Sequence, residues 1–322
     1  MEPSSRLDTV GSGPATGRPG AVIVPLDAST SARAALPLAT FLSTTFGVPL
    51  HRVSVLLPTG TTPGRGREAH AEALSLLHGT SSPTAQPAVA PAAWTASGGP
   101  PPPPPPSHDV LGVVSADGDI EVVLQGASVA AALSDYAARH PGALVCMATH
   151  ARGGLHRRLV GNVIEELLAQ ARFPVIAVGP RVELEQTAHR PETILLAAGP
   201  DLPRATVPLL ASWARLLGAQ VIVARVGAPT GSGPRRGEIW DDRAVADRLV
   251  TRFAQHRAPA MAQRLHGGSV PQALLDLAEQ IGGPMLVAAP VGRATAQPVS
   301  DITHELLQRS PWPVVASVGG TA

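Results

Sequence analysis

The sequence predicts two tandem α/β domains, each a doubly wound, five-stranded parallel-type sheet with helices on both faces. Short β-branched runs alternate with longer amphipathic stretches, which is typical of right-handed βαβ crossovers and a parallel sheet. The whole alternation then occurs a second time along the chain, and such a repeat indicates a duplicated unit. A length of 322 residues is enough for two cores of ordinary size.

The expected elements follow one another in the same order in both copies. The second copy repeats, from 193 to 318, the order of the first. In the first copy we expect strands at 21–26, 51–57, 119–124, 143–148 and 173–178, and helices at 31–46, 66–78, 127–140 and 162–171.

Three pairs of matching segments establish the repeat. "EELLAQARFPVIAV" at 165–178 matches "HELLQRSPWPVVAS" at 304–317, and "VAAALSDYAARHPGALV" from 129 matches "VPQALLDLAEQIGGPML" from 270. At the front, "IVPLDASTSARAALP" from 23 matches "ILLAAGPDLPRATVP" from 194. The front segments lie farther apart than the back ones, so the first copy carries extra chain.

The extra chain is a proline-rich insert at 79–110, with an unbroken proline run at 100–106. Proline lacks an amide hydrogen and fixes φ, so this insert is not expected to form a helix or a central strand. It is expected to run over the surface, extended where the prolines lie. Two interpretations stay open: a docking segment for a protein partner with an aromatic groove, or a loop without a ligand.

These observations divide the chain into a tail, two domains and a linker. Residues 1–19 form a polar N-terminal tail that is expected to be disordered, and 20–180 form domain 1 with its insert. A linker at 181–192 leads to a degenerate domain 2 at 193–318.

The composition excludes several classes of function. A net charge of +1 with 44% hydrophobic residues gives no electrostatic reason to expect nucleic acid or membrane as a partner. The first twenty residues lack an apolar signal region and no stretch is long enough to span a membrane, so we expect a cytoplasmic protein. The basic residues are all arginine, which excludes mechanisms that need a lysine. The single cysteine, Cys146, lies in an apolar run and is expected to be a buried thiol.

Three parts of the first copy are expected to meet beyond the carboxyl ends of the strands, where ligands of such sheets bind. Asp27 closes the first strand, with Ser29 behind it. "MATHARGG" follows the fourth strand, and "GNVIEELL" opens the last helix, whose unpaired amides favour an anion. Asn162 lies at the expected N-cap of that helix, where its side chain can meet an amide or a phosphate.

Taken together, "IVPLDAS" and "MATHARGGLHRRLVGNVIEELLAQARFPVIAV" resemble the universal stress protein family, and the repeat resembles its tandem two-domain bacterial members. In that family the first strand ends V-D-G-S and the nucleotide loop reads G-x-x-G-x9-G-(S/T). The resemblance implies an adenine nucleotide alpha hydrolase-like fold and ATP as the ligand, with or without Mg²⁺.

Carried over by position, the resemblance implies that Asp27 faces the adenine and that Val55 contacts it from the second strand. The four loop positions become Ala148, Ala151, Gly161 and Asn162. Alanine in place of glycine adds a methyl group near the phosphates, and we expect affinity about ten- to a hundredfold lower for that reason. The nucleotide-binding set is completed by the neighbours Ala28, Ser29, Met147, Arg152 and Val163.

The second copy has diverged further from this pattern. Ala198 aligns with Asp27, and Ser300-Asp301 replace Gly161-Asn162, which places a carboxylate where a phosphate would lie. We therefore expect no nucleotide there and a structural role in pairing with the first copy. The terminal strands "FPVIAV" and "WPVVASV" are the expected pairing strands, and the sequence leaves open whether a homodimer forms as well.

The resulting hypothesis is a regulatory, universal stress protein-like protein that binds ATP in its N-terminal domain and acts in stress response through conformation or partner binding. The alternative is a nucleotide-free scaffold or interaction protein of the same fold. No catalytic residues are assigned and no enzyme is expected, because the loop shows no evident general base or metal carboxylate cluster. A slow ATPase or an autophosphorylating enzyme is a third, less favoured hypothesis. His150 and His156 lack the spacing of a metal site, so no metal site is assigned either.

Overall fold

The computed structural model describes residues 17–27, 31–57, 108–116, 119–149, 162–199, 202–226, 242–265, 269–289 and 301–318. The helix expected at 66–78, most of the proline-rich insert and the tail at 1–16 lie outside these residues. No described helix is long and apolar enough to span a membrane.

The first half of the chain carries six strands. Its elements are β1 (Ala21–Pro25), the 3-10 helix η1 (Ser31–Ala35), α1 (Leu36–Phe46), β2 (Leu50–Leu56), β3 (His108–Ala116), β4 (Asp119–Gly126), α3 (Val129–Ala138), β5 (Ala143–Ala148), α4 (Asn162–Gln170) and β6 (Pro174–Val178).

The described residues of the second half repeat the order, and none of them forms a counterpart of β3. After the short helix α5 (Leu184–Ala188), which lies in the expected linker, its elements are β7 (Thr193–Ala197), α6 (Thr206–Leu217), β8 (Gln220–Val226), α7 (Asp242–Gln255), β9 (Ala260–Leu265), α8 (Val270–Ile281), β10 (Met285–Ala288), α9 (Asp301–Arg309) and β11 (Val314–Val318).

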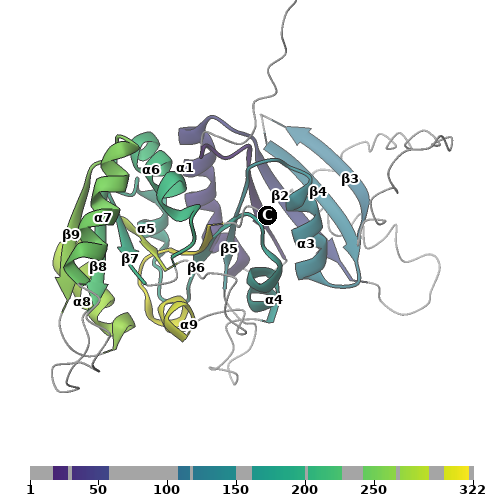
Figure 1. Ribbon diagram of the computed structural model, residues 1–322. Coiled ribbons are helices and arrows are strands. Elements are labelled where there is room, and N and C mark those ends of the chain that lie inside the picture. Colours follow the sequence, from purple (N-terminus) through teal and green to yellow (C-terminus); the bar gives the residue numbers. More distant parts are fainter. Residues whose placement is uncertain are drawn as a thin grey trace, which may run out of the picture.

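All the strands form one eleven-stranded sheet in the order β3-β4-β2-β1-β5-β6-β11-β10-β7-β8-β9, with β3 and β9 at its two ends (Figure 1). Each half has the doubly wound parallel order that was expected, so the α/β fold class is confirmed. The halves are not separate sheets, however. β6 and β11 pair antiparallel, with Val314 opposite Ala177, so that two strongly apolar strands cover each other's edges.

The strand β3 was not expected. It begins at His108, inside the range 79–110 that was assigned to the insert, and it pairs antiparallel with β4 at the edge of the sheet. Proline excludes the preceding residues from a strand, but "HDVLGVVSA" follows the last proline of the run and is rich in valine. The Asp117-Gly118 dipeptide, which lies between β3 and β4 in the sequence, is typical of a β-hairpin turn. The second copy has no such dipeptide at the corresponding place, so the repeat gave no indication of a hairpin.

Two apolar layers hold helices on both faces of the sheet. Core side chains of α3, α4, α8 and α9 pack against one face, and those of α1, α6 and α7 pack against the other. Corresponding helices of the two halves begin or end at the same types of residue. Gly47 and Gly218 adopt positive φ to close α1 and α6, and Ser128 and Ser269 cap α3 and α8 through their hydroxyl groups.

Cys146 lies in β5 with no exposed surface, and burial raises the pKa of its thiol to about 12. Because only the thiolate reacts, we expect a thiol reagent to label none of the folded protein and one group per chain after denaturation. Counting released thionitrobenzoate with and without guanidinium chloride checks this expectation. Stoichiometric labelling without denaturant would contradict it.

Candidate functional site

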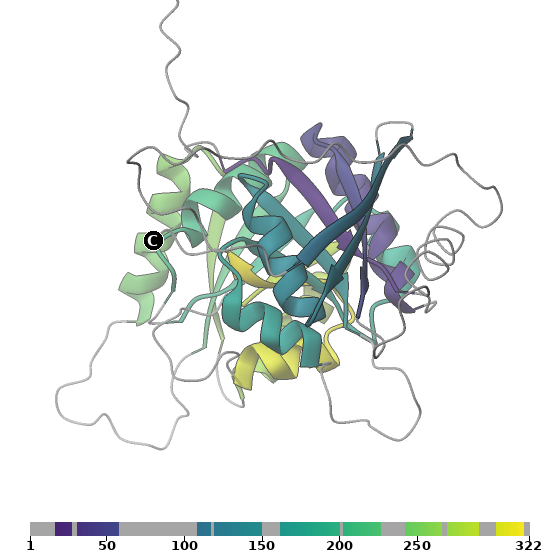
Figure 2. The same cartoon turned by 90° about the vertical axis from the view of Figure 1, so that its right-hand side faces the viewer.

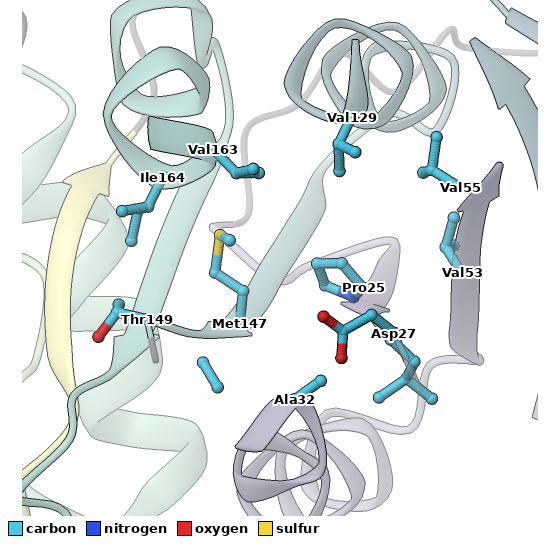
Figure 3. A pocket seen from close by; sticks show the side chains of 12 residues that line it. Pro25, Asp27, Ala32, Val53, Val55, Val129, Met147, Thr149, Val163 and Ile164 are labelled. Carbon is cyan, nitrogen blue, oxygen red and sulfur yellow. The ribbon is translucent and has the colours of Figure 1, made fainter. Parts of the chain in front are cut away.

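A pocket lies where the strand order of the first half reverses, at the carboxyl ends of β1 and β5. Ligands of doubly wound sheets bind at this switch point. The cavity measures about 210 Å³, and Figure 3 shows the side chains around it. Its lining comes from the ends of β1, β2 and β5 and the first turns of η1, α3 and α4: Pro25, Leu26, Asp27, Ala32, Val53, Val55, Val129, Met147, Ala148, Thr149, Val163 and Ile164.

Asp27 supplies the only ionisable side chain among these lining residues. Its carboxylate points toward the middle of the pocket, between Pro25 and Ala32 (Figure 3). The preceding backbone is held firmly, because Leu26 N–H donates to Val53 O at 2.8 Å and Ser54 Oγ donates to the Leu26 carbonyl at 3.2 Å. A carboxylate accepts hydrogen bonds only, so this position favours a ligand group that donates an N–H or O–H hydrogen bond.

The rest of the wall is almost entirely apolar. Val53 and Val55 stand on one side and Met147 on the other, with Val129 and Val163 descending from α3 and α4 (Figure 3). Facing apolar walls of this kind accommodate a flat, weakly polar ring better than a charged or sugar-like group.

The structure brings five of the residues expected from the sequence into this one cavity: Asp27, Val55, Met147, Ala148 and Val163. Asn162 is the first helical residue of α4, and not the N-cap residue that was expected. The remaining expected residues lie outside the described residues: Ala28, Ser29, Ala151, Arg152 and Gly161.

Sequence reasoning missed seven lining residues: Pro25, Leu26, Ala32, Val53, Val129, Thr149 and Ile164. Two of them could have been found. Val53 lies two positions before Val55 on the same strand, and alternate residues of a strand share a face. Val129 directly follows the Ser128 cap, so it belongs to the first turn of its helix.

The equivalent place in the second half is built differently. In the comparison of the two sequence repeats, Ala198 aligns with Asp27. The main-chain hydrogen bonds show that this alignment is wrong by one residue. Ala198 N–H donates to Ala224 O as Leu26 N–H donates to Val53 O, so Ala198 corresponds to Leu26, and Gly199 corresponds to Asp27. The carboxylate is therefore still lost, and the loop after β7 is one residue shorter than the alignment implied.

Two polar side chains bind the backbone at this place in the second half. Arg225, which corresponds to Ser54, donates from its guanidinium to the Ala198 carbonyl at 2.8 Å. Thr303, which corresponds to Ile164, donates to the Ala289 carbonyl at 2.9 Å and is fully buried. Arg225 thus joins β8 to the residue after the end of β7, and Thr303 joins α9 to the residue after the end of β10.

The helix α4 also contacts the second half of the chain. His304 Nδ1 on α9 lies 3.5 Å from Glu165 Oε1 on α4, and both views place these helices side by side (Figures 1 and 2). Gln308 Nε2 lies 2.8 Å from His304 Nε2 on the other side of the ring. Glu165 follows directly on the pocket residues Val163 and Ile164, so the second half contacts the helix that forms one wall of the pocket. Within the described residues no cluster of His, Cys, Asp and Glu is suited to hold a metal ion.

The model of the universal stress protein family matches the chain over residues 20–179. This part of the chain belongs to the universal stress protein family. The matched range ends with β6 and includes every lining residue of the pocket.

Solved structures extend the likeness of the fold across both halves of this chain. A universal stress protein from Archaeoglobus fulgidus aligns with a TM-score of 0.57 at 13% identity, covering 93% of this chain and 96% of that one. A functionally unknown protein from Pseudomonas aeruginosa aligns with a TM-score of 0.55 at 12% identity, covering 95% of this chain and 94% of that one. At such identities the likeness concerns the fold alone. No curated protein matches the sequence.

Proposed function

We propose that the pocket of the first half binds ATP weakly and that the protein is a regulator in stress response rather than an enzyme. The observation that supports this most is the pocket at the switch point, apolar except for one carboxylate that points into it. Membership of residues 20–179 in the universal stress protein family agrees with it.

The lining residues suit the parts of an adenine nucleotide. The exocyclic amine of adenine donates hydrogen bonds, and the Asp27 carboxylate can accept one. The ring would lie between the valines of β2 and Met147. The phosphates would extend toward the first turn of α4, where unpaired amides and the helix dipole favour negative charge. Mg²⁺, where present, would be held mainly by the phosphates and water.

Only one nucleotide per chain is proposed. In the second half, Gly199 stands in the place of Asp27, and Arg225 and Thr303 bind the strand ends directly. These differences support the expectation that the second half has a structural role.

Replacing Asp27 with alanine tests the proposal. We expect wild type to bind ATP saturably with about one site per chain, and Asp27→Ala to bind at least about tenfold more weakly, because the amine of adenine loses a charged acceptor worth about 1.5–3 kcal/mol. Isothermal titration calorimetry with and without Mg²⁺ measures both quantities.

Asp276→Ala is the matched control, because Asp276 is an exposed aspartate on α8 whose Oδ1 accepts a hydrogen bond from its neighbour Gln272. It should bind ATP as wild type does. Absence of saturable binding by wild type up to millimolar ATP would refute the nucleotide proposal. Equal affinity of Asp27→Ala and wild type would remove Asp27 from the site.

The alternative function is a nucleotide-free scaffold of the same fold. It is favoured by the alanines at 148 and 151, where the family pattern has glycines that allow close approach to phosphate. The same titration separates the two functions, because a scaffold would show no saturable ATP binding at all.

A further inference from the structure

Among the strands that the structure describes, β3 lies at one end of the sheet. On its inner side β3 pairs with β4 from His108 opposite Gly126 to Ala116 opposite Asp119. Within the described parts of the chain, no strand pairs with its outer side, and β3 ends the sheet in Figures 1 and 2. An edge strand of nine residues presents a row of unpaired amides and carbonyls, which is a template for another strand.

Two apolar side chains stand exposed on this edge strand. Val110 is 41% exposed and Val113 is 59% exposed. The pairing shifts between Val110 and Gly112, which marks a bulge at Leu111 and turns both valines toward the same face. Their partners on β4 are Leu124 and Val122, which are buried in the core beneath α3. The bulge therefore extends the apolar surface of that core outward to the free edge.

The sequence of β3 lacks the residues with which edge strands usually prevent pairing. Lysine, arginine and proline discourage edge-to-edge contact, and "HDVLGVVSA" contains none of them. Its one charged residue, Asp109, lies near the end of the strand. The opposite edge of the sheet differs, because β9 carries the exposed cation Arg264.

A second copy of this chain fits the edge better than a partner of a different kind. A net charge of +1 means that two copies repel each other only weakly. The chain already joins its two repeated halves by antiparallel pairing of edge strands, β6 with β11. A twofold axis perpendicular to the sheet would pair β3 with itself in the same antiparallel sense. It would also keep the exposed valines of both copies on one face, where they can cover each other.

We propose that two copies of this protein associate through antiparallel pairing of their β3 strands, so that the sheets of the two chains become continuous. The pairing does not involve the nucleotide pocket, and it occurs whether or not ATP binds. Main-chain hydrogen bonds between the two β3 strands stabilise the dimer. Contact of Val110 in one copy with Val113 in the other determines which faces of the two sheets lie on the same side.

The test compares substitutions at the two free edges. Sedimentation velocity of the full chain from about 1 to 100 µM should show a dimer whose fraction rises with concentration. Val113→Lys should weaken dimerisation at least about tenfold, because it places a charged side chain in the apolar contact opposite Val110 of the other copy. Met261→Lys on β9 is the matched control, because Met261 is 44% exposed, and it should dimerise as wild type does.

Hydrogen exchange on wild type gives a readout that does not depend on any variant. Amides of residues 108–116 should become more protected as concentration rises, while those of 260–265 should not change. The proposal is overturned if wild type stays monomeric over this range, if Val113→Lys dimerises normally, or if exchange in β3 is independent of concentration. Dissociation by Met261→Lys would assign the contact to β9 instead and would equally overturn it.

Discussion

Replacing Trp213 with alanine is expected to lower the free energy of unfolding by about 3–5 kcal/mol, the range for removing a large buried aromatic side chain. Trp213 lies on α6 with no exposed surface. Its ring packs against Phe46 of α1, with ring centroids 6.2 Å apart. Because α1 belongs to the first half and α6 to the second, the cavity would open where the two halves meet.

Two further substitutions make the Trp213 experiment specific. Leu216→Ala removes an apolar side chain from the same helix, but Leu216 is 39% exposed, so a loss below about 1 kcal/mol is expected. Trp213→Phe keeps an aromatic ring and removes an indole N–H that has no hydrogen-bond partner within the described structure. It should therefore cost clearly less than alanine.

Urea denaturation followed by circular dichroism measures all three variants, since fluorescence would change with the loss of the indole. A loss for Trp213→Ala no larger than that for Leu216→Ala would show that this contact does not hold the halves together.

Acidification is expected to destabilise the protein through His51, which is 4% exposed on β2. Burial, followed by the charge of His140, lowers the pKa of His51 from 6.5 to about 4. Its Nδ1 lies 2.8 Å from the Tyr136 hydroxyl, and the His140 ring lies 4.8 Å away. The folded state therefore holds this imidazole neutral.

The sign follows from which state binds the proton. The unfolded chain protonates His51 below pH 6.5, while the folded chain does so only near pH 4. Stability is thus fully present above pH 6.5 and falls as the pH drops from 6.5 toward 4. Between pH 7.5 and 4.5 the loss from His51 amounts to about 2–3 kcal/mol.

A comparison of variants separates the stability that is lost through protonation of His51 from the stability that is lost through protonation of carboxylates. His51→Phe should show a pH dependence of unfolding weaker by about 2–3 kcal/mol over that range, whatever its stability at pH 7.5. His189→Gln, at an exposed position, should follow wild type. NMR titration gives a direct check, and an imidazole of residue 51 that protonates near pH 6.5 in the folded protein would contradict the prediction.

Much of the fold could be predicted because the signals are local. The strand expected at 143–148 is β5 without change, and the strand expected at 21–26 is β1 shortened by one residue. Each such element follows from the spacing of apolar residues within a short window. The strand β3 was not expected for a related reason, because the expected elements followed the repeat and β3 has no equivalent among the described residues of the second half.

The site could be predicted in part. The resemblance to the family assigned to the nucleotide site five residues that the structure brings into one pocket: Asp27, Val55, Met147, Ala148 and Val163. Their role toward ATP stays a prediction. Ala32 and Thr149 carry no signal in the sequence, because they reach the pocket only through the way η1 and β5 end beside it.

The sequence by itself determined the order of the described strands and main helices apart from β3, the duplication, and the position of Asp27 at a strand end, because these depend on neighbours along the chain. Only the tertiary structure decided the antiparallel sense and register of the pairing of β6 with β11, the correspondence of Ala198 with Leu26, and the burial of His51 against Tyr136. Each of these depends on which residues far apart in the chain meet and in which register. A shift of one residue in such a pairing turns a side chain to the other face of the sheet.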